Sequence, residues 1–179
     1  TGLHINKDGG NTRITLELLE KFSAHSTHLH LLHGPQSPLS YELAAHHPER
    51  ALDLFNATRE FFADHAIECV SHLVAGNGPG STAHAARSLV FARDHDIDAV
   101  ITNAVRMRTR SNGPIADLLD CARQLVPLDY RHIERRNAEA YLKSSQEMTL
   151  VATEIARAAG EATPRALLKT TREWAERSL

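Results

Sequence analysis

The sequence predicts a mixed α/β fold in which short parallel strands alternate with helices. Three runs typical of strands begin near residues 28, 66 and 98, and each is followed by a stretch with helical spacing of apolar side chains. Repeated β-α units with right-handed crossovers lay such strands in one parallel sheet. A barrel typically needs about eight strands. We therefore expect open sheet edges or uncovered faces that need a partner.

The composition is that of an ordinary soluble globular protein. The chain has 179 residues, of which 42% are hydrophobic and 23% charged, enough for one domain with a real core, with or without an appendage. The net charge of -2 argues against a protein whose whole surface binds nucleic acid, although local basic patches are compatible with it. The first residue is not Met, which is compatible with a piece cut from something longer.

Cysteine usage and hydropathy predict a cytoplasmic protein with no membrane contact. Cys69 and Cys121 are too few for a disulfide framework, and their apolar surroundings predict reduced core thiols. No window has the uninterrupted apolar length of a membrane helix, and the start lacks the form of a signal peptide.

The first elements follow from spacing and turn residues. Residues 14–22 predict a short amphipathic helix, and residues 27–33 alternate as a strand that stops at a Gly-Pro turn. Residues 38–45 predict a short helix, and Pro48 suits the first position of the next one. The apolar side of that helix carries Ala51, Leu52, Phe55 and Phe62.

The middle of the chain predicts two more strands. Residues 66–74 form the second strand, and Ser81 can cap a helix that runs to about Asp96. Residues 99–101 are an apolar run of the kind that a parallel sheet buries on both faces. In such sheets the carboxyl ends of the strands carry the chemistry, so residues 103–106 are the first place to look for a site.

The last third predicts three helices. Pro114 begins a helix whose apolar face carries Ile115, Leu118, Leu119, Ala122 and Leu125. After a charged connection, Ser144 and Glu147 form a capping-box pattern for a helix that Gly160 can end. Thr163-Pro164 then caps a final helix with Leu167, Leu168, Thr171, Trp174 and Ala175 on one side.

Histidines suggest a metal site as one alternative. His28 and His30 project to the same face of a strand, so they can chelate one ion, although a phosphoesterase site also needs carboxylates and further histidines. Strand-face or surface histidines are the other interpretation. Glu42 and His46 stand in the reverse order of the zinc-protease motif, which favours a solvated pair.

Two stretches suggest contacts with phosphate. Gly76 and Gly78 lie in a loop between a strand and a helix, where a phosphate can be cradled, and the alternative is a plain β-α turn. Arg106, Arg108 and Arg110 follow the third strand, where they can meet a DNA backbone, and the alternative is a solvated basic loop.

Four segments, in this order along the chain, carry a resemblance to a known family. They are Arg13–Leu19, Leu31–Gly34, Ile101–Arg106 and Glu139–Ser144 with Glu147-Met148. They resemble the later half of the polymerase-and-histidinol-phosphatase (PHP) domain of bacterial DNA polymerase III alpha subunits, which are C-family DNA polymerases. The likeness is greatest to the actinobacterial type or a paralogue, and it extends to about Gly160. Thr-Asn-x-Val and Tyr-Leu-Lys-Ser are its most specific parts.

The resemblance implies a (β/α)7-type barrel with parallel strands, of which residues 1–136 supply the later units. Residues 137–179 would form a helical appendage that leads toward the polymerase body. The implied parent is a multidomain DNA-directed DNA polymerase, a nucleotidyltransferase that uses Mg or Mn and contacts DNA. The implied partners are the rest of that chain and a proofreading exonuclease subunit.

In metal-binding members of the family, a Cys after the earlier Ser-Gly and the Asp and His of Thr-Asn-Asp-Val-His are late ligands. These positions correspond here to Pro35, Ala104 and Arg106, none of which can coordinate a metal. The early ligands should precede residue 1. The resemblance therefore implies a degenerate metal site and a fragment without catalytic residues or a cofactor, which braces the polymerase or docks partners in DNA replication or repair synthesis.

Two other functions stay open at this point. One is an active metal-dependent phosphoesterase or 3′-5′ exonuclease of the PHP class, with His28 and His30 as ligands. The other is a free-standing α/β module that binds a nucleotide at residues 76–81.

Overall fold

A computed structural model describes residues 7–8, 11–12, 17, 20–21, 29–62 and 64–178. Strands β1 (Lys7–Asp8) and β2 (Asn11–Thr12) pair antiparallel. Within the predicted helix 14–22, the described positions 17 and 20–21 are helical. The rest of that helix and residues 27–28 of the predicted strand 27–33 lie outside the described residues.

The central sheet has three parallel strands in the order β3-β4-β5. They are β3 (Leu31–His33), β4 (His65–Cys69) and β5 (Ala99–Ile101), and the register pairs His33 with Ile67 and Cys69 with Ile101. Since each pair of strands is joined through at least one helix, the prediction of a mixed α/β fold with a parallel sheet is confirmed.

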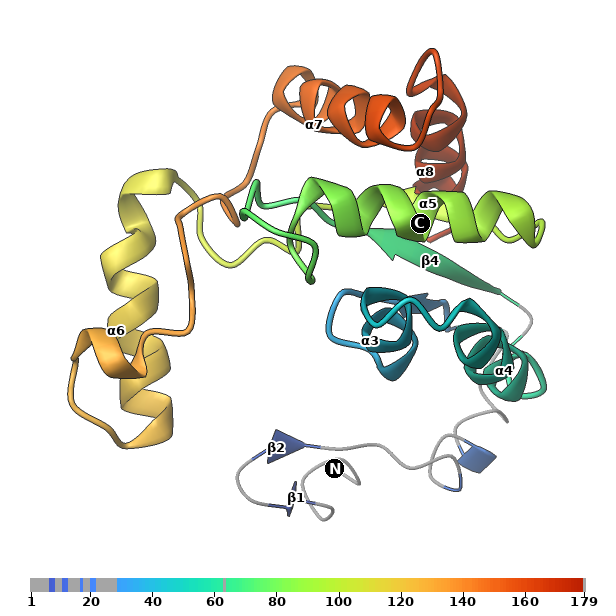
Figure 1. The fold of residues 1–179 in the computed structure, drawn as a ribbon. Helices are drawn as coiled ribbons and strands as arrows, with labels where there is room; N and C mark the ends of the chain where they lie inside the picture. Colours follow the sequence, from blue (N-terminus) through green and yellow to red (C-terminus); the bar gives the residue numbers. More distant parts are fainter. Residues whose placement is uncertain are drawn as a thin grey trace.

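One face of the sheet builds the main core. Side chains alternate along a strand, so Ile67 and Cys69 of β4 lie on this face together with Ile101 of β5. The helices α3 (Pro38–Ala44), α4 (Pro48–Arg59) and α5 (Thr82–Asp94) pack their apolar sides there (Figure 1). Burial raises the pKa of the Cys69 thiol to about 12. Cys69 and Cys121 are free and buried, which confirms the prediction of core thiols.

Local capping starts the helices where the sequence predicts. The Ser81 hydroxyl accepts from the His84 N–H at 3.1 Å at the start of α5. Ser144 and Glu147 form a reciprocal capping box at the start of α7 (Ser145–Ala158). Such caps satisfy main-chain N–H groups that have no partner within the helix.

The two last helices complete the core rather than extend away from it. Helix α7 packs on α5, and α8 (Arg165–Arg177) packs on β5. Trp174 of α8 is buried against Ala66 and Val100 on the second face of the sheet. Pro164 is the N-cap of α8 but gives no side-chain hydrogen bond, and Ala175, predicted to face inward, is exposed.

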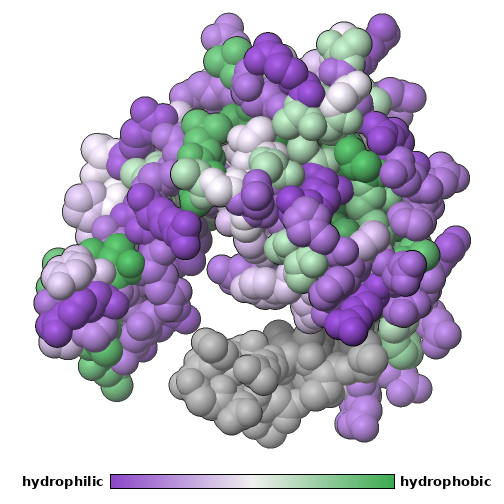
Figure 2. All heavy atoms as spheres, in the orientation of Figure 1, coloured by the Kyte–Doolittle hydropathy of each residue, from purple (hydrophilic) through white to green (hydrophobic). Residues whose placement is uncertain are grey.

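Helix α6 (Gly113–Gln124) corrects a prediction about packing. Its predicted apolar face is exposed: Ile115, Leu118, Leu119, Ala122 and Leu125. The buried side consists of Gly113, Ala116 and Cys121, of which Ala116 packs in a small separate cluster with Met107 and Ala140. Figure 1 shows α6 apart from the sheet, and Figure 2 shows apolar side chains on the surface of that part. The periodicity predicts the helix correctly, but it does not predict which side of the helix packs against other residues.

Two 3-10 turns, η2 (Arg110–Asn112) and η3 (Tyr130–His132), flank α6. Among the residues that the structure describes, no helix is both long and apolar enough to cross a membrane.

Candidate functional site

The carboxyl ends of the three strands meet at one edge of the sheet. Glu68 near the end of β4 joins them, because its carboxylate accepts from the Thr102 hydroxyl at 2.5 Å and lies against Gly34 after β3. A Cβ at Gly34 would meet this carboxylate, so any larger residue there would require the Glu68 side chain to shift. The positions that the resemblance assigns to metal ligands, Pro35, Ala104 and Arg106, follow β3 and β5 at this edge.

Asn103 is the most connected side chain at this edge. It is 5% exposed, and its amide nitrogen donates to the main-chain oxygens of Glu139, at 2.8 Å, and Tyr141, at 2.6 Å. Its own main-chain oxygen accepts from His72 Nε2 at 2.8 Å. The end of β5 is therefore bonded both to the loop after β4 and to the segment that leads into α7.

A buried ion pair supports the same junction. The Lys143 side chain is 4% exposed, and its Nζ lies 3.2 Å from Glu139 Oε2 and 3.3 Å from Asn103 Oδ1. Arg110 binds the other carboxylate oxygen of Glu139 at 2.7 Å. Glu139 thus pairs with two cations, and both of its carboxylate oxygens are engaged within the protein.

The Tyr141 ring connects this cluster to α7. Lys143 Nζ lies 4.3 Å from the ring centre, and the Tyr141 hydroxyl donates to Glu147 Oε1 at 2.5 Å. That hydrogen bond, followed by those from Ser144, lowers the pKa of Glu147 to about 2. The cluster therefore acts as a structural joint.

The three degenerate ligand positions lie at the same edge but carry no ligands. Pro35 follows β3 in a turn, and Ala104 adopts a left-handed φ of 39° that its N–H bond to the Thr102 hydroxyl supports. Arg106 turns to Asp120, 2.7 Å away. The chemistry of these side chains does not fit a divalent ion.

The basic run after β5 does not form one cationic surface. Arg106 pairs with Asp120, and Arg110 shares the Glu139 carboxylate with Lys143. Arg108 is exposed, and no carboxylate within the described ranges pairs with it. Of the three arginines predicted to contact phosphate or DNA, it is the one without an ion-pair partner in the described part of the chain.

The histidine candidates are scattered. His28 lies outside the described residues, and His30 lies at the opposite, amino edge of the sheet, 3.3 Å from Asp64 and against the Trp174 ring. Glu42 contacts His47 at 3.0 Å rather than His46. Over residues 29–62 and 64–178, no three His, Cys, Asp or Glu side chains are grouped as a metal site requires.

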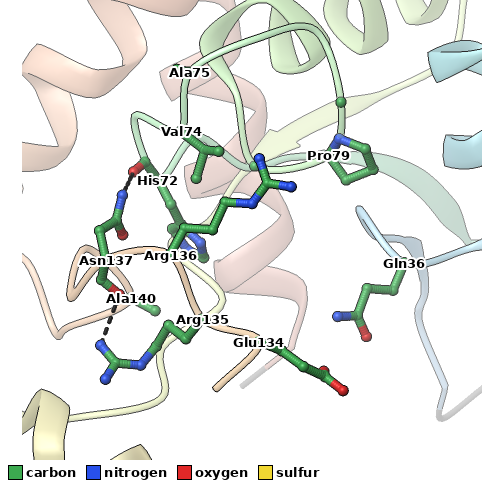
Figure 3. Close-up of a pocket in the computed structure, with 12 residues that line it drawn as sticks. Gln36, His72, Val74, Ala75, Pro79, Glu134, Arg135, Arg136, Asn137 and Ala140 are labelled. Carbon is green, nitrogen blue, oxygen red and sulfur yellow. Dashed lines mark hydrogen bonds between the residues drawn. The ribbon is translucent and has the colours of Figure 1, made fainter. Parts of the chain in front are cut away.

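A pocket of ≈ 300 Å³ lies between the glycine loop and the segment before the joint (Figure 3). The predicted Gly78 lines it, and Gly76 lies in the same loop with φ 96°. Sequence reasoning missed the other main contributors, His72 and Arg136. Arg136 stands in a charged connection without periodicity, so no pattern in the sequence indicates that it faces a loop more than fifty positions earlier.

Comparison with the models of known protein families gives no match, and no curated protein matches the chain.

Proposed function

We propose that this chain is the later part of a non-catalytic PHP domain of a DNA polymerase III alpha subunit. One observation supports this most strongly. The two most specific segments of the resemblance, around Asn103 and Tyr141, bind one another directly. A domain that has lost its metal chemistry but keeps a structural role still needs the residues that join a strand end to a helix start.

The rest of the barrel belongs to the same proposal. The outer edge of β3 has no strand neighbour within the described residues, and Leu32 on that strand is 39% exposed. Earlier strands of a (β/α)7 barrel would pair with this edge and cover this side chain. Such strands would precede residue 1 of this chain.

In this role the chain braces a cytoplasmic polymerase or docks a partner, such as a proofreading subunit, in replication or repair synthesis. Pro35, Ala104 and Arg106 support the non-catalytic part of the proposal, because their chemistry provides no metal donor. In this proposal the rest of the parent chain carries out polymerisation, binds Mg or Mn and makes the main DNA contacts.

A metal and nuclease assay tests the non-catalytic role. The purified chain is incubated with Mn or Zn, its metal content is measured after gel filtration, and release of 3′ nucleotides from single-stranded DNA is followed. We expect no stoichiometric metal and no release. One equivalent of metal that disappears in a His28→Ala, His30→Ala variant would contradict the proposal and favour the active phosphoesterase.

The parentage has a separate test in the reading frame. We expect the coding sequence to continue upstream through a His-x-His strand and downstream through polymerase carboxylates. A frame with neither extension would overturn the assignment to a polymerase.

A further inference from the structure

The pocket beside the glycine loop has an arginine, Arg136, that pairs with no other described side chain. Figure 3 shows the Arg136 side chain extending across the pocket toward Val74 and Pro79 of the loop. No ion pair or hydrogen bond to the Arg136 guanidinium occurs among residues 29–62 and 64–178, although the neighbouring Arg135 has three partners. A free guanidinium at a concave surface is suited to an anionic group.

The main chain that carries Arg136 is held on both sides. Arg135 binds Asp117 at 2.6 Å and the Gly113 oxygen at 2.7 Å. Asn137 donates to the His72 main-chain oxygen at 2.7 Å, which ties the segment to the loop itself. The position of Arg136 is thus fixed before any ligand arrives, and this preorganisation lowers the entropic cost of binding.

The opposite wall of the pocket is built to let a ligand approach the main chain. Gly78 and Gly80 line it, and a Cβ at Gly78 would meet nothing within 4 Å, so there is open space beside that backbone. The loop leads into α5, whose first turn is capped by Ser81. The pocket therefore places a cation opposite a wall of main chain with little side-chain bulk.

Glu134 is the one carboxylate among the residues that line this pocket. Figure 3 shows its side chain pointing away from Arg136, on the side of Gln36. It therefore leaves the guanidinium free, and the volume between Arg136 and the loop is the part suited to an anion.

We propose that this pocket binds a phosphate group, with Arg136 as its charged ligand and the glycine loop as its main-chain wall. The phosphate can belong to a free nucleotide or to the backbone of a DNA strand, since both present the same oxygens. The inference stands on the pocket alone and holds whether or not the parent is a polymerase.

Calorimetric titration of the chain with inorganic phosphate, a nucleoside triphosphate and a short oligodeoxythymidylate tests this site. We expect Arg136→Gln to weaken binding by about tenfold or more, because a charge-assisted hydrogen bond is lost. The matched control is Arg172→Gln, an exposed arginine of α8 outside the pocket, which should bind as the unaltered chain does.

A second variant tests the main-chain wall that the glycine loop provides. Gly78 has no left-handed φ, so Gly78→Val fits the backbone and adds bulk beside the pocket, and it should also weaken binding while the thermal midpoint is retained. Tighter binding of the triphosphate would identify a nucleotide as the source, and tighter, salt-sensitive binding of the oligonucleotide would identify a strand. Absence of binding for all three probes, or equal binding by the Arg136→Gln and Arg172→Gln variants, would overturn the proposal.

Discussion

The side-chain amide of Asn103 donates to the main-chain oxygen of Tyr141, 2.6 Å away and 38 positions along the chain. The same nitrogen also donates to the Glu139 oxygen. One planar group thus fixes two main-chain oxygens of residues 139–141, which lie outside the helices and the three-stranded sheet. This contact positions the entrance to α7 against the end of β5.

Removing this amide should destabilise the fold. In Asn103→Ala the Tyr141 oxygen loses its partner and the Glu139 oxygen keeps only Lys143 Nζ, so we expect a loss of about 2–4 kcal/mol in the free energy of unfolding. Urea unfolding followed by circular dichroism measures it. Asn56→Ala, an exposed position on α4, is the control and should change stability by less than about 0.5 kcal/mol. Equal losses for the two variants would show that the joint contributes nothing.

Trp174 should hold α8 on the sheet. It is 6% exposed, and its Nε1 donates to Asp98 Oδ2 at 2.7 Å. Trp174→Ala should cost about 3–5 kcal/mol, whereas Trp174→Phe keeps most of the apolar contact and should cost about 1–2 kcal/mol for the lost hydrogen bond. Urea unfolding followed by circular dichroism gives both values.

Leu150→Ala, at a side chain of α7 that is 68% exposed, provides the comparison for Trp174. If Trp174→Ala cost no more than Leu150→Ala, α8 would not be part of the core in solution.

Structural features that depend on residues close together in the sequence are predicted correctly. The caps at Ser81 and Ser144 depend on groups within three positions, and both form as predicted. The apolar run 99–101 became a strand buried at every position, because a parallel sheet covered by helices on both sides accepts no polar side chain there.

Features that depend on distant packing were missed. The amphipathic pattern of α6 is real, but a pattern does not say whether a neighbour exists, and Leu119 is 64% exposed. Likewise, the partner that Arg136 faces across the pocket is a loop that only the fold brings near. The apolar run before Asn103 predicts that this residue ends a strand, but its hydrogen bonds to residues 36 and 38 positions later depend on the tertiary fold.

The exposed apolar face of α6 should tolerate polar substitutions. Leu119→Gln should change stability by less than about 0.5 kcal/mol, since the side chain already contacts water. Ala116→Gln, one turn earlier on the buried side, should cost about 1–3 kcal/mol through overpacking against Met107 and Ala140. Urea midpoints at two protein concentrations measure both. A larger loss for Leu119→Gln would mean that this face is covered in solution.

Acid should destabilise the chain through His33. Burial, followed by the charge of His65, lowers the pKa of His33 from 6.5 to about 4. The unfolded chain therefore binds the proton more readily than the folded one between these values. The stability associated with neutral His33 is fully present above pH 6.5 and is lost as the pH falls toward 4, by about 3 kcal/mol in all.

A pair of variants isolates this effect. His33→Gln removes the titrating ring and should flatten the dependence of unfolding free energy on pH between 6.5 and 4. Thr58→Val removes the hydroxyl that lies 3.2 Å from His33 Nε2 but keeps the imidazole buried, so it should lower stability while retaining most of the pH dependence. Urea midpoints measured across that pH range provide the test. If the slope of His33→Gln equalled that of the unaltered chain, the loss in acid would have to come from other groups, such as His65 and His84, because burial lowers the pKa of both.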